Sequence, residues 1–208
     1  RRGVNVIART AVDRVDTGAN LGATVHYRQG DSDEDRTAYG EVVLAAIGRV
    51  PNTDADWFRS SGLKLDERGY VTVDGYGRTN LDGVWALGDI TPGHALAHRA
   101  FEQGITIAEK IAGADPKPVL DDTVPQVVFS FPEAASVGLT LDQAKAREDV
   151  VEPKETAYPM LSNARMLMSG EGGSMTVVSG AFANNPDMQV VLGVHIVSPI
   201  ASDLIAEA

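Results

Sequence analysis

The run TNLDGVWALGD, from Thr79 to Asp89, constrains the fold of this 208-residue chain more than any other segment. Asp82-Gly83 supplies turn residues, and the apolar stretch 84–87 has the length of a buried inner strand. Gly88 then lets a ligand approach the backbone, and Asp89 follows just past the strand's end. Since α/β proteins hold cofactors at such strand ends, the run predicts an aspartate that faces a ligand. The alternative is an ordinary strand and turn with an acid in its loop.

The distribution of apolar and turn residues predicts an α/β fold with short strands. The predicted strands are 4–8, 23–27, 42–47, 84–87, 126–129, 174–179 and 189–197. The stretch 42–47 is apolar throughout, which is typical of a strand that is covered on both faces.

Three further patterns predict helices. Residues 98–112 carry an apolar stripe at helical spacing, formed by Phe101, Ile105, Ala108 and Ile111. We expect this helix to pack its stripe beneath the ligand site. Thr140 and Gln143, three residues apart, form the pattern of a capping box at the start of a helix. Residues 200–208 begin a last helix.

Four segments of the chain resemble, in the same order, motifs of one flavoprotein family. They are 46–53 (AIGRVPNT), 79–89, 124–140 and 192–197 (LGVHIV). The family comprises flavoproteins with two dinucleotide-binding domains, such as dihydrolipoamide dehydrogenase, glutathione reductase and mercuric reductase. Because these matches extend over nearly the whole chain, the chain resembles a member of that family. The resemblance implies FAD and NAD as cofactors.

The resemblance also implies which residues meet the flavin. Asp89, preceded by Gly88, matches the acid that binds the ribityl chain of FAD. The backbone of Ala97, flanked by Leu96 and His98, matches the contact with the pyrimidine edge of the isoalloxazine ring. For His98 the alternative is a cap on the helix that it opens.

A second cofactor contact is implied at Gly48, which matches backbone at the nicotinamide site of the family. The alternative is that Gly48-Arg49 forms a strand-ending turn with a surface arginine. The resemblance places the residue that selects NAD over NADP upstream of Arg1, so both nucleotides stay open.

The resemblance divides the chain into three parts. Residues 1–50 match the end of an NAD-binding domain, 51–118 the C-terminal part of an FAD-binding domain, and 119–208 an α+β dimerisation domain. The stretch 115–118 (DPKP) supports the second boundary because it has the composition of a stiff linker. The chain holds no cysteine and no G-x-G-x-x-G between a strand and a helix, whereas the family carries both near its N-terminus. We therefore expect the C-terminal part of a longer polypeptide, truncated within its dimerisation domain.

Composition argues against several classes of partner. The chain has 18 Lys and Arg against 29 Asp and Glu, a net charge of −11, so it lacks a basic patch for nucleic acid or an anionic membrane. No apolar stretch approaches the roughly 20 residues of a spanning helix. The four histidines and the acids show no metal-ligand spacing, so we expect no metal. Since Arg1-Arg2 also precedes no signal-type apolar region, we expect a soluble cytoplasmic protein, and the lack of cysteine fits a reducing compartment.

Within the family, the segments 132–138, 163–165 and 194–197 are most similar to dihydrolipoamide dehydrogenase. The resemblance implies electron transfer from dihydrolipoamide through a disulfide and FAD to NAD, in a homodimer formed through residues 119–208. A lipoyl-bearing acyltransferase is a further expected partner. No catalytic residue is expected in this stretch, which should be inactive by itself. Phe131 stands where members often carry His, so mycothione, glutathione, mercuric and quinone reductases stay open, as does a non-catalytic dimerisation fragment.

Overall fold

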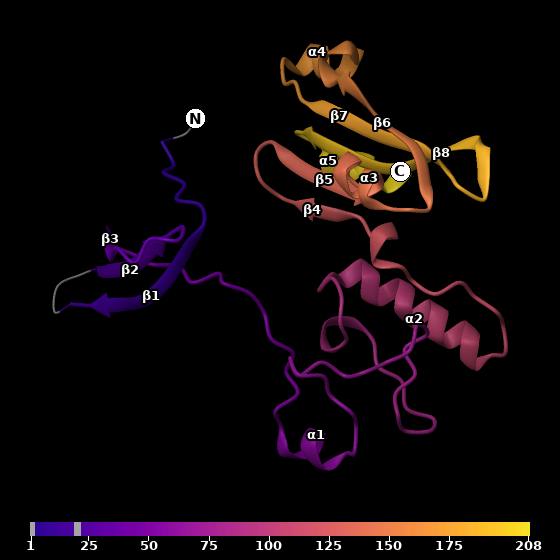
Figure 1. The fold of residues 1–208 in the computed structure, drawn as a ribbon, viewed down its shortest axis with the longest axis horizontal. Helices are drawn as coiled ribbons and strands as arrows, with labels where there is room; N and C mark the ends of the chain where they lie inside the picture. The colour runs from indigo at the N-terminus through magenta and orange to yellow at the C-terminus, as the bar shows by residue number, and fades with distance from the viewer. Residues whose placement is uncertain (1–2, 19–21) are drawn as a thin grey trace. The chain divides into compact units, whose positions relative to one another are not determined.

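A computed structural model describes residues 3–18 and 22–208, and the chain forms two compact units, residues 1–49 and 50–208 (Figure 1). The strands are β1 (Thr10–Thr17), β2 (Ala23–Gln29), β3 (Arg36–Gly40), β4 (Gln126–Val128), β5 (Glu133–Gly138), β6 (Val150–Pro159), β7 (Ser174–Phe182) and β8 (Asn185–Ser198). The α-helices are α1 (Asp56–Ser60), α2 (Ala97–Ile111), α3 (Leu141–Ala146), α4 (Ala164–Ser169) and α5 (Ala201–Leu204). The 3₁₀ helices are η1 (Gly88–Ile90), η2 (Asp121–Thr123), η3 (Met160–Ser162) and η4 (Ile205–Glu207).

The first unit contains one antiparallel sheet in the order β1-β2-β3. β2 confirms the strand predicted at 23–27. The strand predicted at 42–47 is wrong: this stretch joins no sheet, and Val42, Leu44 and Ile47 are between 87% and 94% exposed. The prediction for 4–8 is wrong as well, since β1 begins at Thr10. An inner strand needs a neighbour on each side, and the described residues of this unit provide none for 42–47.

Residues 50–118 form a loop-rich region around a small core of Phe58, Val71 and Ala86. The strand predicted at 84–87 is wrong, because the bonds of Val84 and Ala86 to the facing arm make only one isolated bridge, between Trp85 and Arg78. The Asp82-Gly83 turn folds the chain back on itself, but the two arms are too short to form a ladder. The segment then enters η1 directly.

Helix α2 confirms the helix predicted at 98–112 within one residue at each end. Its predicted orientation is wrong. Phe101, Ile105 and Ile111 are exposed, whereas the buried residues of the helix are Arg99, Thr106 and Ile107. Helical spacing identifies residues that share a face, but it does not say which face the described part of the chain covers.

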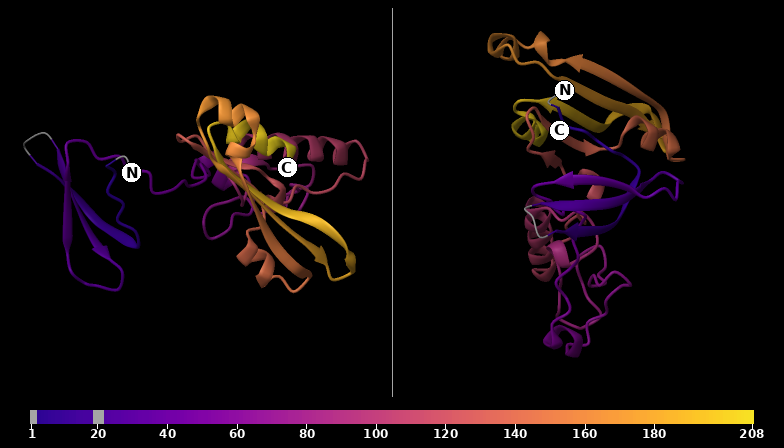
Figure 2. Two further views of the ribbon diagram at one scale, coloured as in Figure 1. Left: turned by 90° about the horizontal axis from the view of Figure 1, so that it is seen from above. Right: turned by 90° about the vertical axis from the view of Figure 1, so that its left-hand side faces the viewer.

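Residues 119–208 contain a five-stranded antiparallel sheet in the order β4-β5-β8-β7-β6, whose twist is visible in Figure 2. Two apolar clusters pack on it. One contains Ile196 and Ile205, and the other contains Ala144 and Val178. Strands β4, β7 and β8 confirm the three strands predicted in this part of the sequence.

The helices of this sheet region follow the predicted patterns in part. The capping box of α3 is confirmed, since the Thr140 hydroxyl accepts from the Gln143 N–H and the Gln143 side chain accepts from the Thr140 N–H. The helix predicted at 200–208 is shorter than expected, because α5 ends at Leu204 and gives way to η4. Among residues 3–18 and 22–208, no helix combines the length and apolar character that crossing a membrane requires.

Candidate functional site

The turn that presents Asp89 is fixed through the backbone of Gly88. The Gly88 N–H donates to Oε1 of Gln103 at 2.8 Å, and the Gly88 carbonyl accepts from the Thr91 hydroxyl at 2.8 Å. The Ile90 carbonyl accepts from the N–H of the buried Val71 at 2.8 Å, which ties η1 to the core. The turn is therefore held from the helix side and from the core side at once.

Asp89 itself is exposed, and no hydrogen bond or ion pair within the described residues engages its carboxylate. Gly88 adopts a φ of +74° and is buried, and a Cβ added there would lie 3.4 Å from the Cβ of Ala100. The backbone at Gly88 thus packs closely on α2 while the next side chain stays free. A free carboxylate beside a rigid turn can accept hydrogen bonds from the hydroxyls of a sugar or polyol.

The N-terminus of α2 is the second feature of this site. Leu96 occupies the N-cap position with extended backbone, and no side chain caps this end of the helix. Ala97 and His98 are exposed. Since the first N–H groups of a helix have no intrahelical partner and carry partial positive charge, this end can bind an electronegative edge of a ligand.

The predicted alternatives for His98 are resolved in part. Its Nε2 lies 2.6 Å from the Pro125 carbonyl, which can only accept, so Nε2 donates and the ring does not cap α2. The imidazole is therefore engaged with the residues that precede β4, and the backbone N–H of His98 is the group left for a ligand. His94 makes a similar link, with its Nε2 3.1 Å from Nε2 of Gln126.

Gly48 belongs to the first unit, whereas the other predicted site residues belong to the second. Its φ is +132°, it is exposed, and a Cβ added there would meet no atom within 4 Å. The backbone around Gly48 is thus open to a ligand. In the described ranges, no group of three or more His, Cys, Asp or Glu is placed to hold a metal ion.

Three residues important for this site were missed from the sequence: Arg99, Gln103 and Asp121. Gln103 holds Gly88, and the Arg99 guanidinium donates from Nε to Asp121 Oδ1 at 2.7 Å and from Nη2 to the Pro92 carbonyl at 2.5 Å. The available signal was the polar spacing of Arg99, Gln103 and Thr106, which places all three on one face of α2. The more prominent apolar stripe obscured it.

Comparison with known sequences gives two family matches. Residues 1–104 match the family described as pyridine nucleotide-disulphide oxidoreductase, and residues 124–208 match the dimerisation domain of the same family. A dihydrolipoyl dehydrogenase of Cupriavidus necator is 39% identical over 210 residues, covering 100% of this chain and 42% of the relative. One from Geobacillus stearothermophilus is 38% identical over 98% of this chain and 40% of the relative. The chain thus spans about two fifths of the length of these relatives.

Solved structures show the same fold. The crystal structure of LpdA from Mycobacterium tuberculosis superposes with a TM-score of 0.83 at 31% identity, covering 99% of this chain and 42% of that one. The flavoprotein disulfide reductase RclA from Escherichia coli superposes with a TM-score of 0.73 over 95% of this chain and 42% of that one, and at 23% identity this shows the fold alone. Together with the two family matches, these similarities show that the chain belongs to the pyridine nucleotide-disulphide oxidoreductase family.

Proposed function

We propose that this chain is part of an FAD-dependent dihydrolipoamide dehydrogenase, which passes electrons from dihydrolipoamide through a disulfide and FAD to NAD. The relatives named above as dihydrolipoyl dehydrogenases support this proposal, since they match the chain from end to end at 38–39% identity. The full-length flavoprotein to which the chain would belong is termed the parent.

The observation that carries the proposal is the pairing of a free acid with an open helix end. Asp89 has no partner among the described residues, and the N-terminus of α2 has no side-chain cap. A ribityl chain offers hydroxyl donors for the carboxylate, and the pyrimidine edge of a flavin offers oxygen and nitrogen acceptors for N–H groups. These residues therefore fit FAD, which when bound supplies a two-electron carrier between a disulfide and NAD.

Each predicted site residue then has a defined task. Asp89 binds the ribityl hydroxyls, and Gly88 keeps the turn close to α2. The backbone from Leu96 through Ala97 to His98 would hold the flavin ring, since the partial positive charge at the N-terminus of α2 favours an electronegative edge. The open backbone at Gly48 receives the nicotinamide of NAD.

The domain assignment follows the same proposal: residues 1–50 complete an NAD-binding domain, 51–118 an FAD-binding domain, and 119–208 a dimerisation domain. We infer a homodimer formed through 119–208, supported by the dimerisation-domain match at 124–208. A lipoyl-bearing acyltransferase is a further inferred partner, since the net charge of −11 would favour a basic docking segment.

Phe131 favours a second candidate, another flavoprotein reductase of the same family. The resemblance to dihydrolipoamide dehydrogenase leads us to expect His at this position. Phe131 stands there instead, and its side chain is 59% exposed. Steady-state kinetics on the parent discriminate the two. We expect a specificity constant for dihydrolipoamide with NAD far above that for NADPH with glutathione disulfide or mycothiol disulfide, and the reverse preference would favour the second candidate.

Substitution of Asp89 tests the flavin site directly. Asp89→Ala removes a charge-assisted hydrogen bond, so we expect FAD to bind the parent about ten- to a hundredfold more weakly. Asp82→Ala is the matched control, because Asp82 is an exposed acid of the neighbouring turn. FAD affinity is measured by fluorescence titration of the apoprotein. Unchanged affinity in Asp89→Ala would exclude this residue as a flavin ligand.

A further inference from the structure

The buried face of α2 carries a charge. The Arg99 side chain is only 7% exposed, yet a guanidinium remains protonated at any physiological pH. A buried charge is costly unless it is paired and hydrogen-bonded. The contacts of Arg99 must therefore offset the cost of burying it.

Those contacts join two segments that are far apart in the sequence. Nη2 binds the carbonyl of Pro92, three residues after Asp89, and Nε binds Asp121, at the start of η2. One planar side chain thus connects the turn that carries Asp89 with the segment that leads into the five-stranded sheet. Because the fork of a guanidinium is rigid, the two bonds fix a direction as well as a distance.

The loop is shaped around this side chain. Gly93 has a φ of +118°, and a Cβ added there would overlap Nη2 of Arg99 and lie 2.6 Å from Oδ2 of Asp121. A cavity of about 330 Å³ also borders Pro92, Arg99 and Asp121, so the loop has space to shift if the guanidinium is removed. The close approach shows that the loop packs directly on the Arg99 side chain, and the adjacent space would let the loop move if that side chain were shortened.

Nη1 of Arg99 is buried without a hydrogen-bond partner in the part of the chain that the structure describes. An unsatisfied buried donor opposes folding. A lysine would avoid this orphan group and could still pair with Asp121, but its single nitrogen would not reproduce the two bonds of the fork. The structure is thus better explained by a need for two directed bonds than by a need for charge alone.

We propose that Arg99 is a positioning residue for the flavin site: it sets the spacing between the Asp89 carboxylate and the N-terminus of α2 by fixing the Pro92 carbonyl against Asp121. This inference rests on the proposed function for its ligand, FAD. Arg99 itself need not touch the cofactor. It acts through the loop 89–93, which it holds against the helix.

The test compares Arg99→Lys and Arg99→Ala with Arg28→Lys. Arg28 is the matched control, because it makes a two-bond pair with Asp13 at 2.9 and 2.6 Å in the sheet of the first unit. In the parent, we expect both Arg99 variants to bind FAD about tenfold more weakly, the size expected when one hydrogen bond is lost, and to change the visible circular dichroism of bound flavin. Arg28→Lys should change neither.

A second readout requires no cofactor. In the 208-residue chain, amide hydrogen exchange at residues 91–96 should become at least about tenfold faster in both Arg99 variants, with exchange in β8 unchanged. Exchange in β8 also shows that each variant is folded. If FAD affinity, the flavin spectrum and exchange at 91–96 all stay within twofold of the unsubstituted protein, the proposal is overturned.

The outcomes separate this inference from the proposed function. If Asp89→Ala weakens FAD binding but the Arg99 variants do not, the flavin site stands and the positioning role of Arg99 fails. If the Arg99 variants speed exchange at 91–96 but neither they nor Asp89→Ala affect FAD, the loop is held as described and the flavin assignment fails. A fall in melting temperature alone, with flavin properties unchanged, would reduce Arg99 to a structural role.

Discussion

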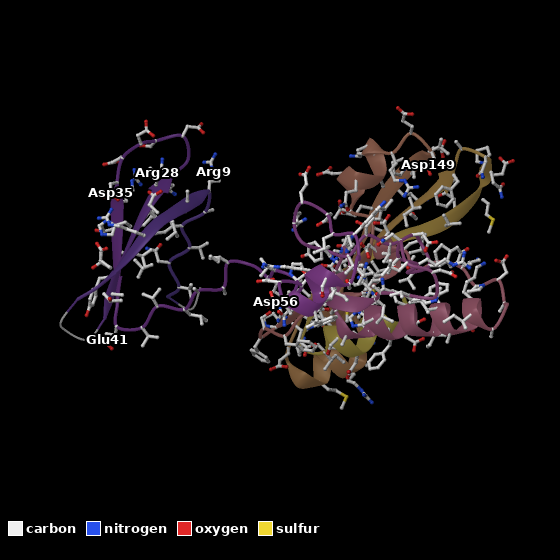
Figure 3. All side chains as sticks on the ribbon, turned by 90° about the horizontal axis from the view of Figure 1, so that it is seen from below. Arg9, Arg28, Asp35, Glu41, Asp56 and Asp149 are labelled. Atoms are coloured by element: carbon white, nitrogen blue, oxygen red, sulfur yellow. The ribbon has the colours of Figure 1, made fainter. Side chains whose placement is uncertain are left out.

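Among the described residues of the first unit, Ala23 in β2 is the one buried apolar residue. The five-stranded sheet, by contrast, carries two buried apolar clusters, around Ile196 and around Val178. Charged side chains occupy the smaller sheet instead. Arg28 binds Asp13 through two hydrogen bonds of 2.9 and 2.6 Å, and Arg28 and Asp35 lie at the same end of the sheet (Figure 3).

The difference indicates what each region needs from its surroundings. Exposed ion pairs contribute little free energy, while buried apolar surface contributes about 25 cal/mol per Å². The five-stranded sheet therefore holds its own core. The first unit exposes apolar residues to solvent instead, as at Val42 and Leu44.

Hydrogen exchange in the 208-residue chain should show the largest effect of this contrast. We expect amides in β7 and β8 to exchange at least about a thousandfold more slowly than those in 42–47, because the former are inner ladder positions and the latter are unpaired. Exchange is measured by mass spectrometry of peptides from each region. Comparable protection in both would mean that 42–47 finds a partner strand, and the contrast would be lost.

Truncation of one apolar side chain in each region gives the next largest effect. Ile196 is 3% exposed, so Ile196→Ala should lower the free energy of unfolding by about 2–5 kcal/mol. Leu44→Ala is the matched control and should change it by less than about 0.5 kcal/mol, since Leu44 is already in solvent. Urea titration with hydrogen exchange as the readout measures the free energy of unfolding of both variants. If Leu44→Ala lowered the free energy of unfolding as much as Ile196→Ala, the first unit would have an apolar core of its own.

Titration of Asp13 should show the smallest effect. The hydrogen bond from Arg28 holds the pKa of Asp13 below its ordinary value. A lowered pKa in the folded state means that the pair stabilises the sheet above the unfolded pKa of about 3.9, and that this contribution is lost as pH falls through the folded pKa. Carboxyl chemical shifts from NMR measure the titration. Arg28→Gln should return the pKa of Asp13 toward its ordinary value, and no change would show that the pair does not form in solution.

How well the sequence predicted each element depended on whether the determining contacts are local. The capping box of Thr140 and Gln143 needs only four residues, and it is present as predicted. β7 and β8 pair with each other across a short turn, and their patterns were sufficient as well. By contrast, 42–47 has the composition of an inner strand, but composition does not supply the neighbouring strands.

The candidate site was predicted in the same partial way. Asp89 follows Gly88 in a short 3₁₀ turn rather than at the end of a strand, yet its side chain is free, as a ligand-facing acid requires. The supports of the turn could not be predicted, because Gln103 and Arg99 act from a helix that begins eight residues later. Hydrogen bonds between such distant segments follow from the fold and leave only a faint pattern in the sequence.

The open stretch 42–47 (VVLAAI) also affects how the chain behaves at high concentration. It is a six-residue apolar segment without charge, proline or glycine, and its backbone lies outside every sheet of the described residues. Segments of this composition stack readily with copies of themselves into cross-β assemblies. Aggregation of the isolated chain would therefore begin at this segment, because an apolar stretch whose backbone has no partner strand can pair with copies of itself.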